Sequence, residues 1–246
     1  MRNLIFCLVC LLVSTGLYAS TQGSDLRVMS YNVRNGIGMD GKQDFQRVAE
    51  VIAKVNPDVM AVQELDSMTR RSKNTYVLEQ IARSVKMNYV YGPAIKYDGG
   101  KYGIGLLSKE KPLHVKTVAL PGREEARALL VVEFESYVFL ATHLSLTEAD
   151  QLASVELILK EAAQAGKPVL MAGDMNSIPS SPVQTALRKD FEVFTDGTWK
   201  TCNGECIDFI YGYKDGKTKF SVLQRRLVED HMASDHCPVW IDIRFR

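Results

Sequence analysis

The stretch GMDGKQDFQRVAEVIAKVNPDVMAVQE, residues 38–64, contains a helix pattern followed by a strand pattern. Asp44 is a predicted helix cap, and apolar residues then recur at helical spacing: Phe45, Val48, Ala49 and Ile52. Asn56-Pro57 ends this helix, and residues 58–63 form the next strand. A helix that leads into a buried strand indicates a fold in which helices and strands alternate.

The same alternation continues on both sides of this stretch. A strand is predicted before it over residues 26–31, and helices are predicted around residues 76–85 and from Thr147, where Asp150 completes a capping box. Further strands are predicted over residues 102–108, 113–120, 128–134, 137–142, 169–172, 207–211, 220–228 and 239–243. Helical crossovers mixed with hairpins predict one α/β domain (α+β mixed) with mixed sheets flanked by helices.

The amino terminus has the pattern of a secretory signal peptide. Arg2 precedes an apolar run over residues 4–13, and Ala19 lies before a polar stretch. We therefore expect residues 1–19 to be removed, residues 20–246 to form the domain, and the protein to be exported to the periplasm or the medium. No later window is apolar and long enough to span a membrane.

Composition and charge exclude some classes of protein. The 246 residues are 46% hydrophobic and 24% charged, which is globular composition and excludes a disordered or collagen-like chain. Residues 1–19 contain one of the 30 basic residues and none of the 29 acidic ones, so residues 20–246 carry 29 of each. Proteins that bind polymeric nucleic acid usually carry a basic surplus. Polymeric nucleic acid is therefore a possible partner but not the favoured one.

The cysteines do not form a disulfide framework. Cys7 and Cys10 lie in the predicted signal peptide, so Cys202, Cys206 and Cys237 remain. Cys202 and Cys206 flank a turn-like Asn-Gly-Glu sequence. They could close a small disulfide after export, or they could be buried thiols.

Polar residues gather where the predicted strands end. They are Asn32, Glu64, His143, Asp174 with Asn176, Asp208, and Asp235 with His236. Loops at strand ends of a rigid scaffold are common positions for binding groups. Oxygen ligands from several strand ends, together with two histidines, point to a magnesium site beside an acid/base pair.

Each of these residues also has a structural explanation. Asp174 and Asn176 could form an Asx-type turn, and His143 could be a hydrogen-bonded structural histidine. Asp208 is harder to explain in this way because it lies in the apolar run 207–210. A lone buried carboxylate costs free energy unless it has a partner.

Several short motifs occur in one order along the chain. They are MSYN (29–32), QE (63–64), Arg127 in EARALL, ATHL (141–144), GDMN (173–176), CIDFI (206–210) and SDHCPV (234–239). With them, the chain from about residue 26 to residue 243 resembles the endonuclease/exonuclease/phosphatase superfamily. This group of magnesium-dependent enzymes includes DNase I-like nucleases, inositol polyphosphate 5-phosphatases and neutral sphingomyelinases. The resemblance implies a DNase I-like four-layer sandwich, with two mixed β-sheets packed face to face and flanked by helices.

The resemblance also implies a metal site. Glu64 and Asp235 would coordinate Mg²⁺, with Asn32 as a further ligand or close contact, and Mn²⁺ would substitute. Asp174 and Asn176 lie two apart on one strand face and would point together toward the scissile phosphate or a second metal. Asn176 would donate to a phosphate oxygen, and Asp174 would orient or deprotonate the attacking water.

The remaining site residues implied by the resemblance are two histidines and their neighbours. Asp208 would hydrogen-bond His236, and this pair is our choice of general base. His143 would contact a phosphate oxygen or assist the leaving group, and Arg127 would add positive charge. In some DNase-like members the first histidine pairs with a glutamate on an earlier strand, but residues 98–103 offer no glutamate.

These features predict an exported, monomeric, magnesium-dependent hydrolase of phosphate esters, with a small-molecule or lipid-headgroup substrate. A secreted non-specific nuclease is the enzymatic alternative, and an inactive binding module with the same fold is the alternative of another class. Four tyrosines near Lys96 and Lys101 could frame a substrate cleft or serve as packing residues: Tyr89, Tyr91, Tyr97 and Tyr102.

Overall fold

The computed structural model describes residues 24–246, so the predicted signal peptide lies outside the described residues. The strands are β1 (Ser24–Asn32), β2 (Val59–Ser67), β3 (Asn88–Tyr97), β4 (Gly100–Ser108), β5 (His114–Leu120), β6 (Arg127–Glu133), β7 (Val138–His143), β8 (Val169–Asp174), β9 (Phe191–Val193), β10 (Asp208–Tyr213), β11 (Phe220–Leu227) and β12 (Val239–Phe245). The helices are η1 (Arg34–Gly36), α1 (Phe45–Val55), α2 (Val77–Val85), α3 (Glu148–Gln164) and α4 (Pro182–Asp190).

These strands form two mixed sheets of six strands each. The first has the order β11-β12-β1-β2-β4-β3, and the second has the order β5-β6-β7-β8-β10-β9. One parallel pair lies at the centre of each sheet, β1 with β2 and β7 with β8. The connections of these pairs run through α1 and α3, as parallel strands require. The prediction of a DNase I-like sandwich of two mixed sheets is confirmed.

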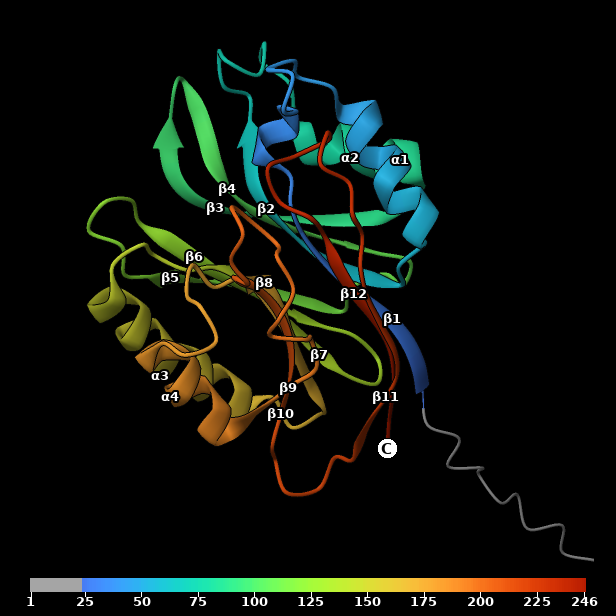
Figure 1. Ribbon diagram of the computed structural model, residues 1–246, viewed down its shortest axis with the longest axis vertical. Helices are drawn as coiled ribbons and strands as arrows, with labels where there is room; N and C mark the ends of the chain where they lie inside the picture. The colour runs from blue at the N-terminus through green and yellow to red at the C-terminus, as the bar shows by residue number, and fades with distance from the viewer. Residues whose placement is uncertain (1–23) are drawn as a thin grey trace, which may run out of the picture.

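The molecule is layered, with helices outside and the sheets inside. Figure 1 shows α1 and α2 over the first sheet, and α3 and α4 over the second. Ile104, Leu130 and Phe139 belong to the apolar core between the two sheets. Ile52 of α1 and Ile158 of α3 belong to the two outer cores, where helices pack on a sheet. This packing fixes the strand ends relative to one another, and the site residues lie on those ends.

Asp44 caps α1 as the sequence predicts. Its side chain accepts a hydrogen bond from the backbone N–H of Arg47 at 3.0 Å. We expect Asp44→Ala to lower the free energy of unfolding by about 1 kcal/mol, because an N–H of the first turn would lose its acceptor. Urea denaturation measures this change, and Asp44→Asn, which keeps the acceptor oxygen, is the control. An equal loss in both variants would contradict the capping role.

Three local predictions need correction. Residues 58–63 were expected to complete a strand before Glu64, but β2 runs on to Ser67 through a bulge. Thr147 forms no capping box, because its side chain does not cap α3 and its hydroxyl instead donates to Glu124 at 3.2 Å. Helix α4 was not predicted, although Ser181 caps it by accepting from Gln184 N. Its sequence carries few apolar residues, so helical periodicity is weak there.

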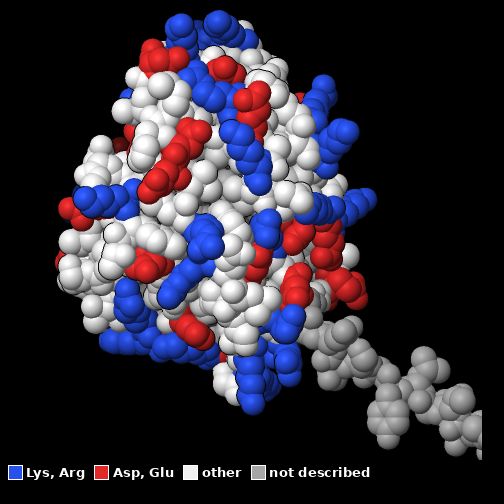
Figure 2. Space-filling model, turned by 45° about the vertical axis from the view of Figure 1, so that its right-hand side comes forward, with Lys and Arg blue, Asp and Glu red and all other residues white. Residues whose placement is uncertain are grey.

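Two surface features bear on the class of partner. On the face shown in Figure 2, acidic and basic residues are mixed over the middle, and Lys and Arg also gather at the top and along the lower edge. Among residues 24–246, none of the helices combines the length and the apolar character that a bilayer crossing requires.

Candidate active site

His236 and Asp208 form a buried hydrogen-bonded pair. Asp208 is the first residue of β10, His236 lies just before β12, and His236 Nδ1 is 2.9 Å from Asp208 Oδ2. Burial alone would lower the pKa of His236, but the charge and hydrogen bond of Asp208 outweigh it and raise the pKa to about 12. Asp174 adds to this effect, with Oδ2 at 3.7 Å from His236 Nε2. The imidazolium form is therefore favoured between the two carboxylates.

His143 has the opposite electrostatic environment. Burial, together with the charge of Arg127, lowers its pKa to about 4, although the charge of Asp174 opposes this shift. Arg127 Nη1 lies 3.4 Å from His143 Nδ1. Because a guanidinium can only donate, Nδ1 is the acceptor and the proton of the neutral ring is on Nε2. That N–H faces Asp174 Oδ2, 3.5 Å away.

Strand register explains why these groups meet. Asp174 ends β8, where it lies directly opposite His143 of β7 and Asp208 of β10. Residues paired across neighbouring strands lie side by side. The strand register therefore places Asp174, Asp208 and His143 side by side in the second sheet. The loop before β12 of the first sheet brings His236 to them.

Asn32 connects the two sheets at the site. Its side-chain N–H group donates to Glu64 Oε1 at 2.9 Å and to Asp174 Oδ2 at 3.1 Å. Glu64 lies at the β2 bulge with a φ of 58°, a left-handed conformation that a glutamate rarely adopts. Backbone strain at an observed outlier of this kind often marks a functional residue.

Glu64 is a carboxylate in an unfavourable environment. Burial raises its pKa, and the charges of Asp174 and Asp235 raise it further, although Asn32 and His236 oppose them. Carboxylates crowded in this way repel one another until a cation offsets their charge.

Asp235 is half-buried and held by its neighbours. Its Oδ2 lies 3.4 Å from Arg34 Nε. The preceding Ser234 donates from its hydroxyl to the backbone carbonyl of Asn32 at 2.8 Å. The loop before β12 is thereby tied to the end of β1, close to Glu64.

Asn176 differs from the prediction. It was expected to share a strand face with Asp174, but β8 ends at Asp174 and Asn176 has a φ of 47°. Its backbone N–H donates to Asp174 Oδ1 at 2.9 Å, which makes an Asx-type turn. Its side-chain N–H group donates to the Leu144 carbonyl at 2.9 Å.

Three residues at the site were not predicted from the sequence. Arg34 pairs with Asp235, Ser234 anchors the β12 loop, and Glu125 accepts from Arg127 at 2.8 Å. Each lies within two residues of a predicted site residue in the sequence. The signal available for these three residues was that they lie close to Asn32, His236 and Arg127 in the sequence. Their supporting role depends on contacts in the folded chain, which a sequence motif does not show.

The residues present fit a divalent cation. Asp208 Oδ1 is buried and has no hydrogen-bond partner within residues 24–246. Ligand atoms of Asp174, Asp208 and His236 lie within 4.8 Å of one another. The adjacent donors of Glu64, Asp235 and Asn32 are all oxygens, which Mg²⁺ prefers. Because His236 Nδ1 is already bonded to Asp208, the oxygen set is the better candidate for the ligands.

Comparison with known proteins identifies the family. A sequence profile described as Endonuclease/Exonuclease/phosphatase family matches residues 29–236, which span the motifs from Asn32 to His236. The chain belongs to this family. Hydrolysis of phosphate esters is the general activity to which that membership points. No curated protein matches the sequence.

Solved structures of the family share the fold. An endonuclease/exonuclease/phosphatase from Beutenbergia cavernae has a TM-score of 0.71 at 22% identity, covering 89% of this chain and 71% of that one. A family protein from Bacteroides thetaiotaomicron has a TM-score of 0.72 at 16% identity, covering 92% and 99%. A mannosyl-6-phosphatase from the same species has a TM-score of 0.69 at 15% identity, covering 89% and 99%.

The first histidine, His143, has an arginine rather than a glutamate as its Nδ1 partner. Residues 98–103 supply no glutamate, and Arg127 occupies the Nδ1 side of His143 instead. Glu125 in turn holds Arg127. A carboxylate partner would favour the charged imidazolium, whereas Arg127 favours the neutral ring.

The second histidine lies next to a cysteine that is a free thiol. Cys202 and His236 form an isolated antiparallel bridge, and Cys202, Cys206 and Cys237 are buried free thiols. Of the two alternatives for Cys202 and Cys206, the structure has the thiols.

Proposed function

We propose that this protein is an exported, Mg²⁺-dependent hydrolase of phosphate esters. The observation that carries the proposal is the convergence on Asp174, which lies within 3.7 Å of Asn32, His143 and His236 side-chain nitrogens. Three N–H donors and several carboxylates in one buried cluster suit the charges that develop when water attacks a phosphate.

Glu64, Asp235 and Asn32 would hold the metal in this proposal. Each supplies a side-chain oxygen, and the carboxylate of Glu64 is crowded by those of Asp174 and Asp235, of which Asp235 pairs with Arg34. When bound, the divalent cation would polarise a phosphate oxygen and, by its charge, lower the pKa of nearby water and of His236. Mn²⁺ is expected to substitute because it accepts the same ligands.

The histidines and Asp174 would handle protons and charge. His236, oriented by Asp208 at 2.9 Å, would take a proton from the attacking water or return one to the leaving oxygen. Asp174 would orient that water. His143 would donate its Nε2–H to a phosphate oxygen, and Arg127 would add positive charge behind it.

The favoured substrate is a small-molecule or lipid-headgroup phosphoester. Residues 20–246 carry equal numbers of acidic and basic residues, and Figure 2 shows the two kinds mixed over the middle of its face. A polymeric nucleic acid substrate would gain most of its affinity from a basic surface.

Hydrolysis assays with model esters test the proposed function. We expect turnover of p-nitrophenyl phosphate or bis-p-nitrophenyl phosphate with Mg²⁺ or Mn²⁺, and loss of turnover with EDTA. Turnover that persists in EDTA would contradict metal dependence, and no turnover of either ester would favour an inactive binding module. Faster nicking of plasmid DNA than hydrolysis of the esters would favour the nuclease.

We also propose that residues 1–19 direct export. The support is the sequence pattern alone, with Arg2 before an apolar run and Ala19 before a polar stretch. Expression of the full chain in a bacterial host, with mass spectrometry of the periplasmic fraction, tests it. A mature chain beginning near residue 20 is the expected result, and an intact chain in the cytosol would contradict it.

A further inference from the structure

We propose that Tyr97, Arg71, Tyr102 and Glu125 form a subsite for a polyol, the hydroxylated part of the substrate ester. These four residues, called the polyol strip below, lie beside the catalytic cluster. The proposal rests on the proposed function, because it assigns the alcohol side of the phosphoester that the cluster would hydrolyse.

The strip begins on the inner face of the β3–β4 hairpin. Side chains alternate between the faces of a strand, and directly opposite residues share a face. Tyr102 is opposite Asp66, and Tyr97 lies beside it, with the two rings 6.1 Å apart. Tyr89 and Tyr91 instead pack edge-on against Tyr76 near α2. The four tyrosines therefore do not frame one cleft, and only Tyr97 and Tyr102 lie on the site's side.

Arg71 is fixed in place over these rings. Its Nε and Nη2 donate to the two oxygens of Asp66 at 2.7 and 2.8 Å, and the Asp66 side chain is fully buried. Its guanidinium carbon lies 4.5 Å from the centre of the Tyr97 ring and 5.5 Å from that of Tyr102. Nη1 donates to the Tyr97 hydroxyl at 3.3 Å. One N–H on each terminal nitrogen is then left over from these bonds.

The pairing of buried Asp66 with partly exposed Arg71 is not explained by folding stability alone. A buried carboxylate is costly to desolvate, and here it holds an arginine whose side chain is still 38% exposed. Thr69 donates to the same carboxylate at 2.6 Å, so Asp66 is itself fixed. An exposed group held by buried partners is pre-organised for recognition, because little side-chain entropy is lost on binding.

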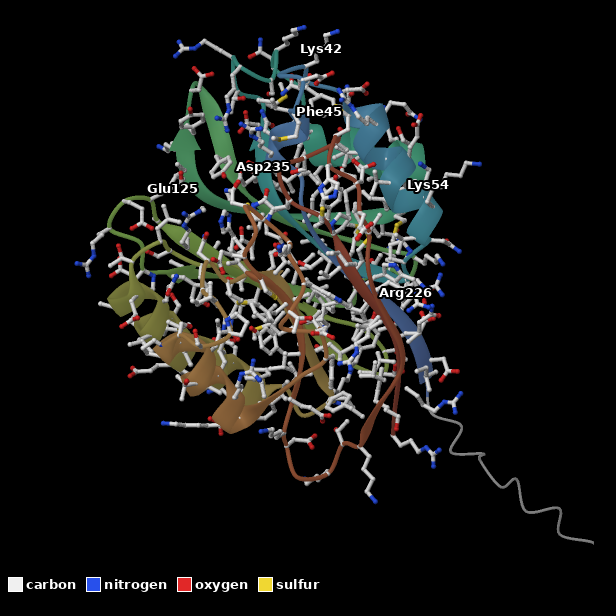
Figure 3. The ribbon with its side chains drawn as sticks, in the orientation of Figure 1. Lys42, Phe45, Lys54, Glu125, Arg226 and Asp235 are labelled. Carbon is white, nitrogen blue, oxygen red and sulfur yellow. The ribbon has the colours of Figure 1, made fainter. Side chains whose placement is uncertain are left out.

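Glu125 connects the strip to the catalytic cluster through Arg127. Burial raises the pKa of Tyr102, and the charges of Glu64 and Glu125 raise it further, while Arg71 and Arg127 oppose the rise in the pKa of Glu125 that burial causes, so these groups lie within electrostatic range of one another. Glu125 bonds Arg127 at 2.8 Å, and Arg127 lies 3.4 Å from His143. Figure 3 labels Glu125 and Asp235, which come from loops of opposite sheets and lie on neighbouring parts of the view. A phosphate held at the cluster would place its alcohol group over the strip.

The chemistry of the strip fits a neutral polyol. The exposed ring of Tyr97 offers an apolar face for C–H groups, Arg71 and the Tyr97 hydroxyl offer donors, and Glu125 offers an acceptor. Asp66 offsets the charge of Arg71, so the strip does not attract a second phosphate strongly. Glu125 repels one, and a nucleic acid strand that continued along the strip would meet the same repulsion.

A matched pair of esters tests the assignment. Glucose 6-phosphate and cyclohexylmethyl phosphate carry the same phosphate on a six-membered ring, and only the first has hydroxyls. We expect the wild-type protein with Mg²⁺ to have a lower KM for the glucose ester, measured with the monoesters and with their methyl diesters. The ratio of the two kcat/KM values should fall about tenfold in Tyr97→Ala, equal to about 1.4 kcal/mol, and in Arg71→Lys.

Two further variants serve as controls for Tyr97→Ala and Arg71→Lys. Tyr97→Phe keeps the ring and should lose less of the preference than Tyr97→Ala. Arg70→Lys is the matched control, because Arg70 is 79% exposed and bonds Asp98 rather than the strip. Equal KM values for the two esters, or an equal loss of preference in Arg70→Lys and Tyr97→Ala, would overturn the assignment. Circular dichroism of each variant separates a binding loss from misfolding.

Further assays distinguish the source of the polyol, and they separate a failure of the polyol strip from a failure of the proposed function. Soluble glycerophosphoinositol compared with phosphatidylinositol in vesicles distinguishes a free polyol ester from a lipid headgroup, and hydrolysis of either at the expected preference supports the strip. Hydrolysis of model esters without a polyol preference overturns the strip alone. No hydrolysis of any ester with Mg²⁺ or Mn²⁺ overturns the proposed function and the strip with it.

Discussion

Replacing His236 with alanine is expected to lower kcat by about 10²–10⁴-fold while the affinity for Mg²⁺ is largely kept. The reason is that His236 is the only imidazole in the described chain bonded to a carboxylate at 2.9 Å, and it is not among the proposed oxygen ligands. Steady-state kinetics on a hydrolysed model ester measures the first effect. Titration calorimetry with Mg²⁺ measures the second.

A nearby histidine provides the control for this prediction. His231 is exposed and bonds Cys237 at 3.4 Å, so His231→Ala should leave both kcat and metal affinity close to wild type. Asp208→Asn should lower kcat less than His236→Ala, because the imidazole remains but loses its anionic partner. Loss of Mg²⁺ affinity in His236→Ala as large as that in a ligand variant would contradict the division of roles.

Glu64→Gln is expected to weaken Mg²⁺ binding by about 100-fold or more and to abolish metal-dependent turnover. The same substitution should not lower the melting temperature in EDTA. Burial and the neighbouring charges raise the pKa of Glu64, so its carboxylate form is unfavourable in the folded chain. A neutral side chain removes that repulsion.

Thermal unfolding with and without Mg²⁺ measures both parts of this prediction. A bound ligand raises the melting temperature of the protein that binds it, so wild type should be stabilised by Mg²⁺ and Glu64→Gln should not. Glu79→Gln is the control, since Glu79 pairs with Arg83 on the surface of α2. If Mg²⁺ stabilised Glu64→Gln as much as wild type, Glu64 would not be a ligand.

Much of the fold follows from local sequence patterns. The spacing of apolar residues in α1, with Asp44 before it and Asn56-Pro57 after it, predicts that helix because all three signals agree. The β2 bulge is different. Glu64 takes a left-handed conformation that its side chain does not favour, so strand patterning suggested an end where the strand continues. The Glu64 carboxylate accepts a hydrogen bond from Asn32, a tertiary contact that local strand patterning does not predict.

The site was predictable where its residues end strands. Asn32, His143 and Asp174 each end a strand in the structure, and the packing of the two sheets brings those ends together. Asn176 was placed wrongly, because alternation holds only while the strand continues. Arg34 and Glu125 were missed, since a residue that positions a neighbour leaves no periodic signal in the sequence.

The central claim is that oxygens of Glu64 and Asp235 bind one divalent cation beside Asp174. Anomalous diffraction from crystals of the protein grown with Mn²⁺ locates the ion directly. We predict a peak within coordination distance of both carboxylates, and its loss in crystals of Glu64→Gln. A peak held only by Asp174, Asp208 and His236, or a peak that survives the substitution, would contradict the claim.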